Sequence, residues 1–134
     1  MIGIFLITHG TLGESLIQCA CHVLNKRPLQ IVQLGVAAQD DPLDVLPLAR
    51  DMLQLVDSGE GVLLLTDIFG ATPSNIALKL LQPGHVEGVA GASLPMLLRA
   101  LTYREKDLDT LVAKTVAGGR DGVLQTRGAR DAAG

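Results

Sequence analysis

The stretch that decides the fold is IGIFLITHGTLGES, residues 2–15. It begins with IGIFLIT, a run of almost entirely apolar residues, which is typical of a strand covered on both faces of a parallel sheet. The run stops at Thr8-His9-Gly10, and a further glycine, Gly13, precedes a segment with helical periodicity. A histidine therefore stands where a buried strand ends, which makes it a candidate for chemistry at the edge of a sheet.

Strand-like and helix-like segments alternate along the rest of the chain. Apolar or alternating runs of strand length are each followed by a run whose apolar residues have helical spacing. This order predicts an α/β fold: a doubly wound, mostly parallel sheet with helices on both faces. Strands are expected at residues 2–8, 29–35, 61–66 and 86–92, and helices at 14–25, 42–56, 73–81, 95–103 and 107–117.

Capping and helix-stopping residues mark several of these boundaries. Asp40 or Asp41 is expected to cap the second helix, and Thr72 the third, because each precedes a proline that fits the first helical turn. The pair Gly118-Gly119 is expected to end the last helix. A short terminal strand is expected at residues 123–126.

Length, charge and composition exclude several classes of protein. With 134 residues, the chain has the size of one domain, expected at residues 1–126 with a loose tail at 127–134. A net charge of −3, no basic stripe and few aromatic rings argue against nucleic acid as a partner. No run approaches the ~20 apolar residues of a membrane helix, and no secretory signal is visible. We therefore expect a cytoplasmic protein without membrane insertion.

The sequence C-A-C-H at residues 19–22 does not predict a metal site. On a helix the two cysteines point about 200° apart, so only Cys19 and His22 share a face. Two ligands do not make a zinc site. His22 and His85 are expected to be ordinary surface or loop histidines, since neither has an acidic partner in a loop that follows a strand.

Polar side chains gather in the loops after three of the predicted strands. His9 follows the first, Asp67 the third and Ser93 the fourth. Parallel strands end at the same edge of an open sheet, and ligands bind beyond that edge. If the first and third strands are neighbours, the carboxylate can hold one ring nitrogen of the histidine and leave the other free to attack. Thr72 and the free amides of the next helix could hold an anion.

These residues together describe a phosphoryl acceptor. A structural histidine and a turn-capping aspartate remain alternatives on the residues alone, because both are common at strand ends. The loop after the first strand matches neither a G-x-G-x-x-G fingerprint nor a Walker loop.

Three motifs in order, THG, DIFGATPSN and GASLPM, resemble the mannose-family IIA domain of the bacterial phosphoenolpyruvate-dependent sugar phosphotransferase system. The likeness covers roughly residues 1–126. It implies a homodimer in which the last strand, residues 122–126 here, is exchanged between subunits. Phe69, Ala71 and Ser93 stand where relatives often have tryptophan, glycine and asparagine.

By this resemblance, His9 is the phosphorylated histidine, Asp67 its partner acid and Thr72 the hydroxyl of the phosphate loop. Gly10 and Ser93 would border the phosphoryl group. The donor would be phospho-HPr and the acceptor a IIB component, with no metal or organic cofactor. IIB and the membrane components would be separate proteins, with which this chain could associate.

The sequence leaves other functions open. The chain could be a regulatory phosphocarrier whose phosphorylation state controls partner proteins without sugar transport. The related phosphocarrier of dihydroxyacetone kinases tends to read S-H-S where this chain has Thr8-His9-Gly10, which argues against it. A flavin or nucleotide domain is disfavoured because the loops after the strands lack stacking aromatic rings. The sugar cannot be named from the sequence.

Overall fold

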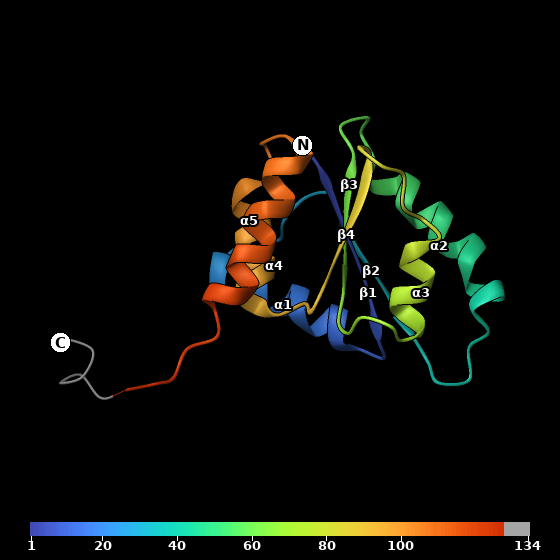
Figure 1. Ribbon diagram of the computed structural model, residues 1–134, viewed down its shortest axis with the longest axis horizontal. Helices are drawn as coiled ribbons and strands as arrows, with labels where there is room; N and C mark the ends of the chain where they lie inside the picture. Colours follow the sequence, from blue (N-terminus) through green and yellow to red (C-terminus); the bar gives the residue numbers. More distant parts are fainter. Residues whose placement is uncertain (128–134) are drawn as a thin grey trace.

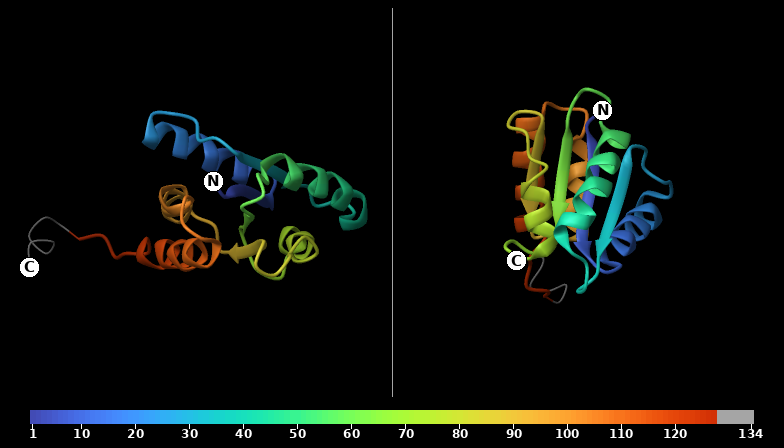
Figure 2. Two further views of the ribbon diagram at one scale, coloured as in Figure 1. Left: turned by 90° about the horizontal axis from the view of Figure 1, so that it is seen from above. Right: turned by 90° about the vertical axis from the view of Figure 1, so that its right-hand side faces the viewer.

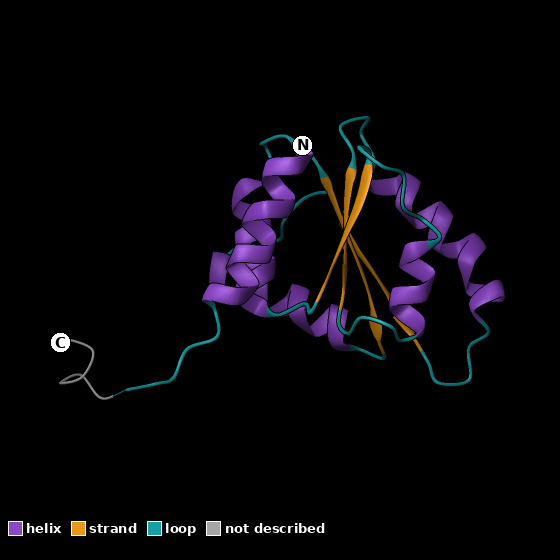
Figure 3. Ribbon diagram, viewed as in Figure 1, coloured by secondary structure: helices purple, strands orange, loops and turns teal. Residues whose placement is uncertain are grey.

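Residues 1–127, the range that the computed structural model describes, contain one parallel sheet (Figures 1 and 3). The central strand β1 is paired on both sides, and every residue but its last is buried. This arrangement confirms the reading of residues 2–8 as a strand covered on both faces. The strands are β1 (Gly3–His9), β2 (Ile31–Val36), β3 (Val62–Thr66) and β4 (Val86–Ala90), in the order β2-β1-β3-β4.

Helices cover both faces of the sheet, as Figure 1 and the two views of Figure 2 show. The doubly wound α/β fold predicted from the sequence is therefore confirmed. One face carries α1 (Leu12–Leu24), α4 (Leu94–Tyr103) and α5 (Leu108–Asp121), and the other carries α2 (Pro42–Val56) and α3 (Thr72–Leu78). No helix within the described range is long and apolar enough to cross a membrane.

The alternation of side chains along β1 divides the interior into two cores. Ile4 and Leu6 pack on the side of α1 and α4, whereas Phe5 and Ile7 pack on the side of α2 and α3. All four side chains are fully buried. Gly3 allows the close approach of α2, because a Cβ there would lie 2.2 Å from the carbonyl oxygen of Val56. β1 is thus held by packing on both faces along its length, up to the end of the strand at His9.

The expected start of α2 is confirmed, and the expected end of α5 is wrong. Asp41 caps α2 by accepting a hydrogen bond from the Leu43 N–H at 2.9 Å. α5 continues through Gly118-Gly119, because these glycines are where α4 packs against it. A Cβ on Gly118 would lie 2.5 Å from Cβ of Arg99. The glycines therefore serve a helix contact and do not stop the helix.

The expected terminal strand does not form within this chain. Residues 123–126 have no strand conformation, and the segment leads away from the body of the domain (Figure 1). Val123 is 83% exposed. A strand needs the edge of a neighbouring strand to pair with, and this segment pairs with none among residues 1–127. Exchange of this segment with a second copy stays a prediction, and the tail expected at 127–134 lies almost wholly outside the described residues.

Candidate functional site

The strands β1, β3 and β4 end side by side at one edge of the sheet, here called the carboxyl edge. Ile7 of β1 pairs with Thr66 of β3, and Thr66 pairs with Ala90 of β4. His9 is the last residue of β1 and Asp67 is the first residue after β3, so the two lie next to one another. The parallel register thus brings together residues that are 58 positions apart in the sequence.

Asp67 holds both the ring and the backbone of His9. Its Oδ2 lies 2.8 Å from Nδ1 of His9 and also accepts a hydrogen bond from the His9 backbone N–H at 3.0 Å. Its Oδ1 accepts from the Ile68 N–H at 3.1 Å. An ionised carboxylate can only accept, so Nδ1 carries the hydrogen and Nε2 keeps the free lone pair of the neutral ring.

The two side chains differ in exposure, and this difference suits an exposed attacking ring held by a half-buried acid. The His9 side chain is 52% exposed and that of Asp67 only 11%. Burial acts to raise the pKa of Asp67, but the hydrogen bonds from the backbone and ring of His9 outweigh it and hold this pKa below its usual value. The acid is therefore ionised near neutral pH and can stabilise a positively charged ring.

Glycines fix the backbone that follows His9. Gly10 has a φ of +52°, and its N–H donates to the carbonyl oxygen of Val36 at 3.0 Å. Its own carbonyl lies against Gly35 of β2, where a Cβ would come within 2.1 Å of that oxygen. Gly35 therefore positions the loop, a role that sequence reasoning missed. The available signal was the glycine at the end of the predicted strand 29–35, because a glycine in a strand often marks a close backbone approach.

The start of α1 is tied to the end of β1 by a buried hydroxyl. Thr8 is fully buried, and its Oγ1 accepts a hydrogen bond from the Gly13 N–H at 2.8 Å. A Cβ on Gly13 would lie 3.0 Å from that oxygen. The flanking residues thus hold His9 from the strand side and from the helix side.

Thr72 and Ser93 lie at the same edge, at the starts of α3 and α4. The prediction that Thr72 caps α3 is wrong, because the cap position is Ala71 and Thr72 is already helical. The extended backbone of Ala71 starts the helix without a side-chain hydrogen bond. Ser93 does cap its helix, accepting from the Met96 N–H at 3.3 Å. Its hydroxyl is therefore engaged, whereas that of Thr72 makes no hydrogen bond with any described residue.

A second histidine–aspartate pair lies at the opposite edge, here called the amino edge, where the strands begin. Nε2 of His85, just before β4, lies 2.6 Å from Oδ2 of Asp57 at the end of α2. Sequence reasoning missed this pair because it searched for acids only in loops that follow strands.

Sites of other kinds are not evident in the described part of the chain. No group of three or more histidine, cysteine, aspartate or glutamate side chains is placed to hold a metal ion there. Cys19 is exposed and Cys21 is half-buried, and neither is bonded to the other.

The fold and the site define an α/β domain that presents an exposed, carboxylate-held histidine beyond the strand ends. The sequence model of the family EIIA-man, described as PTS system fructose IIA component, matches residues 3–116. The chain therefore belongs to this family of IIA components of the phosphotransferase system (PTS).

Individual relatives agree with this assignment. The PTS system mannose-specific EIIAB component of Escherichia coli (strain K12) is 31% identical over 125 residues, which are 91% of this chain. Those residues are only 38% of that protein, so the chain spans little more than a third of its relative's length.

Solved structures share the fold. The mannose/sorbose specific IIA subunit of the phosphotransferase system from Enterococcus faecalis superposes with a TM-score of 0.83 at 22% identity, covering 94% of this chain and 95% of that one. The phosphotransferase system component EIIA from Streptococcus agalactiae gives a TM-score of 0.81 at 23% identity, covering 93% and 97%.

Proposed function

We propose that this IIA component is a phosphocarrier that works through a phosphohistidine on His9. It takes the phosphoryl group from phospho-HPr and passes it to a IIB component of a mannose-family sugar transporter. The observation that carries the proposal is the 2.8 Å contact between Nδ1 of His9 and Asp67, on a ring that is half exposed. Membership of the IIA family supports it.

The transfer step needs no proton to move on this chain. The lone pair of Nε2 attacks the phosphorus of the donor's phosphohistidine, the new N–P bond forms and the donor's N–P bond breaks. Its electron pair returns to the donor ring. Because Nδ1 keeps its hydrogen, the His9 ring gains positive charge as the bond forms, and the ionised Asp67 beside it stabilises that charge. Transfer to IIB is the same step in reverse.

The surroundings suit the negative charge of the phosphoryl group. A phosphoryl group carries nearly two negative charges at neutral pH. Helices α1, α3 and α4 all begin at the carboxyl edge, and helix N-termini favour anions. In this proposal the free hydroxyl of Thr72 binds the phosphoryl oxygens. Gly10, which has open space where a Cβ would lie, and the backbone at Ser93 border the group.

The partner proteins would dock on the apolar surface next to the site. Ile68 and Phe69 directly follow Asp67, and both side chains are exposed. Exposed aromatic and aliphatic side chains are typical of the centre of a protein interface. The same surface would meet donor and acceptor in turn, since both must reach Nε2.

A homodimer with an exchanged strand remains part of the proposal. β4 lies at one end of the sheet order and is paired on one side only. The exposed Val123 and Leu124 have the apolar side chains that a strand added to this edge would bury. Sedimentation of the full chain and of a chain truncated after Gly122 tests the exchange. A truncated chain that dimerises as strongly as the full one would refute it.

The phosphorylation itself is tested by intact mass after incubation with phosphoenolpyruvate, enzyme I and HPr. We expect one acid-labile phosphoryl group on the wild type and none on His9→Ala. His85→Ala is the matched control, because it removes the histidine of the other pair, and it should be phosphorylated like the wild type. No label on the wild type beside a charged HPr, or full label on His9→Ala, would overturn the proposal.

A further inference from the structure

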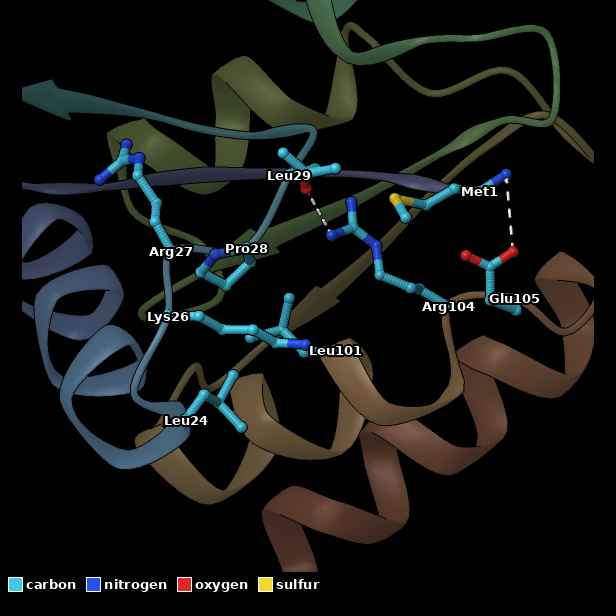
Figure 4. A pocket seen from close by; sticks show the side chains of 9 residues that line it. All are labelled: Met1, Leu24, Lys26, Arg27, Pro28, Leu29, Leu101, Arg104 and Glu105. Carbon is cyan, nitrogen blue, oxygen red and sulfur yellow. Dashed lines mark hydrogen bonds and ion pairs between the residues drawn. The ribbon is translucent and has the colours of Figure 1, made fainter.

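A cavity of about 310 Å³ lies at the amino edge, on the far side of the domain from His9. It is formed by the segment between α1 and β2 together with the end of α4 (Figure 4). Its size is at the lower end of the range of about 300–1,000 Å³ that is usual for small-molecule sites. Neither the proposed phosphoryl transfer nor the family assignment gives it a role.

Arg104, at the end of α4, is a buried cation on the wall of this cavity. It is only 5% exposed. Its guanidinium donates to the carbonyl oxygens of Ile2 at 2.9 and 3.0 Å, Gln30 at 2.7 Å and Leu29 at 2.5 Å. These contacts use all of its N–H groups except one on Nη1. Arg104 thus holds the starts of β1 and β2 together.

The charge of Arg104 is not matched by a carboxylate. Among residues 1–127 it forms no ion pair, and carbonyl oxygens supply only partial negative charge. Burial lowers the pKa of Arg104, and the nearby charge of Glu105 acts against this. Glu105 itself lies 3.9 Å from the amino group of Met1. A charged side chain this deeply buried is rarely left without a counter-charge.

Two more cations and an apolar wall complete the lining. Lys26 and Arg27 line the same cavity and form no ion pair with any described residue. Glu105 is the one acidic side chain in the lining. The side chains of Leu24 and Leu101 supply apolar surface to the same lining (Figure 4). The cavity therefore offers positive charge and an apolar surface together.

We propose that this cavity binds a small organic anion. Its negative group would lie near Arg104 and Lys26, with Arg27 at the rim, and its apolar part would cover Leu24 and Leu101. The ligand supplies the counter-charge that the chain does not provide. An apolar part of a few carbons fits the volume, and neither a bare anion nor a neutral alcohol would use both halves of the site.

The proposal is tested by titrating ¹⁵N-labelled protein with three probes: butyl phosphate, inorganic phosphate and 1-butanol. We expect butyl phosphate to bind saturably and to shift the amide signals of residues 25–30 and of Arg104. It should bind about tenfold more tightly than inorganic phosphate, since burial of two methylene groups is worth about that factor. 1-Butanol should not saturate the site.

Variants at the rim keep the test independent of Arg104, whose loss would unfold the ends of two strands. Lys26→Gln with Arg27→Gln should weaken butyl phosphate binding by up to about tenfold, as expected for two exposed charge contacts. Arg50→Gln with Lys79→Gln is the matched control. It removes the same charge from a separate cavity between α2 and the turn after α3, and it should leave the affinity unchanged.

Three outcomes would overturn the proposal. They are no saturable shift at residues 25–30, equal affinity of butyl and inorganic phosphate, or an affinity that the rim variant leaves unchanged. Shifts confined to residues near His9 would count as the first of these, because the anion would then occupy the carboxyl edge. Since no phosphoryl transfer is measured, failure here leaves the proposed role of His9 untouched.

Discussion

Among residues 1–127, two histidine–aspartate pairs lie at opposite edges of the same sheet, and they differ in the backbone structure around them. At the carboxyl edge Asp67 engages Nδ1 of His9 at 2.8 Å. At the amino edge Asp57 engages Nε2 of His85 at 2.6 Å. The histidine side chains are 52% and 38% exposed. Side-chain chemistry alone does not separate the two.

The two pairs differ in which ends of the helices lie near them. The pair at the carboxyl edge lies where helices begin, and helix N-termini stabilise negative charge. Asp57 is the residue at which α2 ends, where the helix favours positive charge and disfavours an anion. A phosphoryl group would be stabilised at the first pair and destabilised at the second. The proposed phosphoryl acceptor is therefore the pair at the carboxyl edge and not the pair at the amino edge.

The pair at the amino edge has a structural explanation. Oδ1 of Asp57 accepts a hydrogen bond from the Gly59 N–H at 2.8 Å, and the carbonyl of His85 accepts from the Val62 N–H at 2.9 Å. A Cβ on Gly61 would lie 2.6 Å from that carbonyl oxygen. The pair thus joins the turn before β3 to the start of β4.

The largest contrast is expected between Asp67→Asn and Asp57→Asn. The first removes the charge that stabilises the His9 ring and should slow phosphoryl transfer from HPr by roughly a hundredfold or more. The second should leave the rate unchanged. Rapid-quench measurement of phosphoryl transfer checks both, and equal rates for the two variants would remove the distinction between the edges.

Replacement of Gly35 should damage the carboxyl edge through the backbone. In Gly35→Ala the new Cβ would lie 2.1 Å from the carbonyl oxygen of Gly10, so the loop that carries His9 must move. We expect a loss of about 1–3 kcal/mol in the free energy of unfolding and a slower phosphoryl transfer. Gly88→Ala in β4 is the control, because its nearest contact would be an ordinary 3.4 Å. Urea unfolding and the transfer rate are measured on both, and similar behaviour of the two would count against the positioning role.

The pair at the amino edge should affect stability and its pH dependence without affecting transfer. Burial acts to raise the pKa of Asp57, but hydrogen bonds, first that of His85, outweigh it and lower the pKa below the reference value of 3.8. A lowered acid pKa stabilises the fold above about pH 4, and this is lost as the pH falls through the folded-state value.

Asp57→Asn should therefore cost about 1 kcal/mol of unfolding free energy at neutral pH, and this cost should shrink in acid. Asp51→Asn on the exposed side of α2 is the control and should cost little at any pH. Thermal unfolding of both variants and the wild type, measured from pH 7 down to pH 3, gives these stability differences. A cost that stays constant over that range would contradict the lowered pKa.

The smallest effects are expected for the hydroxyl groups of Thr72 and Ser93 at the carboxyl edge, which should differ in their effect on stability and on transfer rate. Ser93→Ala removes the cap of α4 and should lower the free energy of unfolding by about 1 kcal/mol, with little change in transfer rate. Thr72→Ala should leave stability unchanged and slow transfer, because this hydroxyl caps nothing and is free for the phosphoryl group. The reverse pattern would exchange the roles of the two residues.

The sequence was sufficient where a local pattern and the fold point to the same structure. The apolar run of β1 is buried on both faces, and the contact of His9 with Asp67 follows from parallel strands that end together. Their catalytic roles stay predictions. The sequence was insufficient where the local structure depends on packing between elements that are far apart in the chain. Gly118 has the residue type that often ends a helix, but in the fold it allows α4 to pack closely against α5. Asp57 contacts His85 only because α2 ends beside the start of β4.

Oδ2 of Asp67 accepts hydrogen bonds from both the ring and the backbone of His9, and this has a consequence for the proposed phosphocarrier. The backbone hydrogen bond does not depend on what Nε2 carries, so the loop has the same anchor with and without a phosphoryl group. The two forms of the proposed carrier, with and without a phosphoryl group on His9, would then differ in charge far more than in shape. A partner that distinguishes the two forms has to respond to that charge. A higher salt concentration should therefore reduce the difference between its affinities for the two forms.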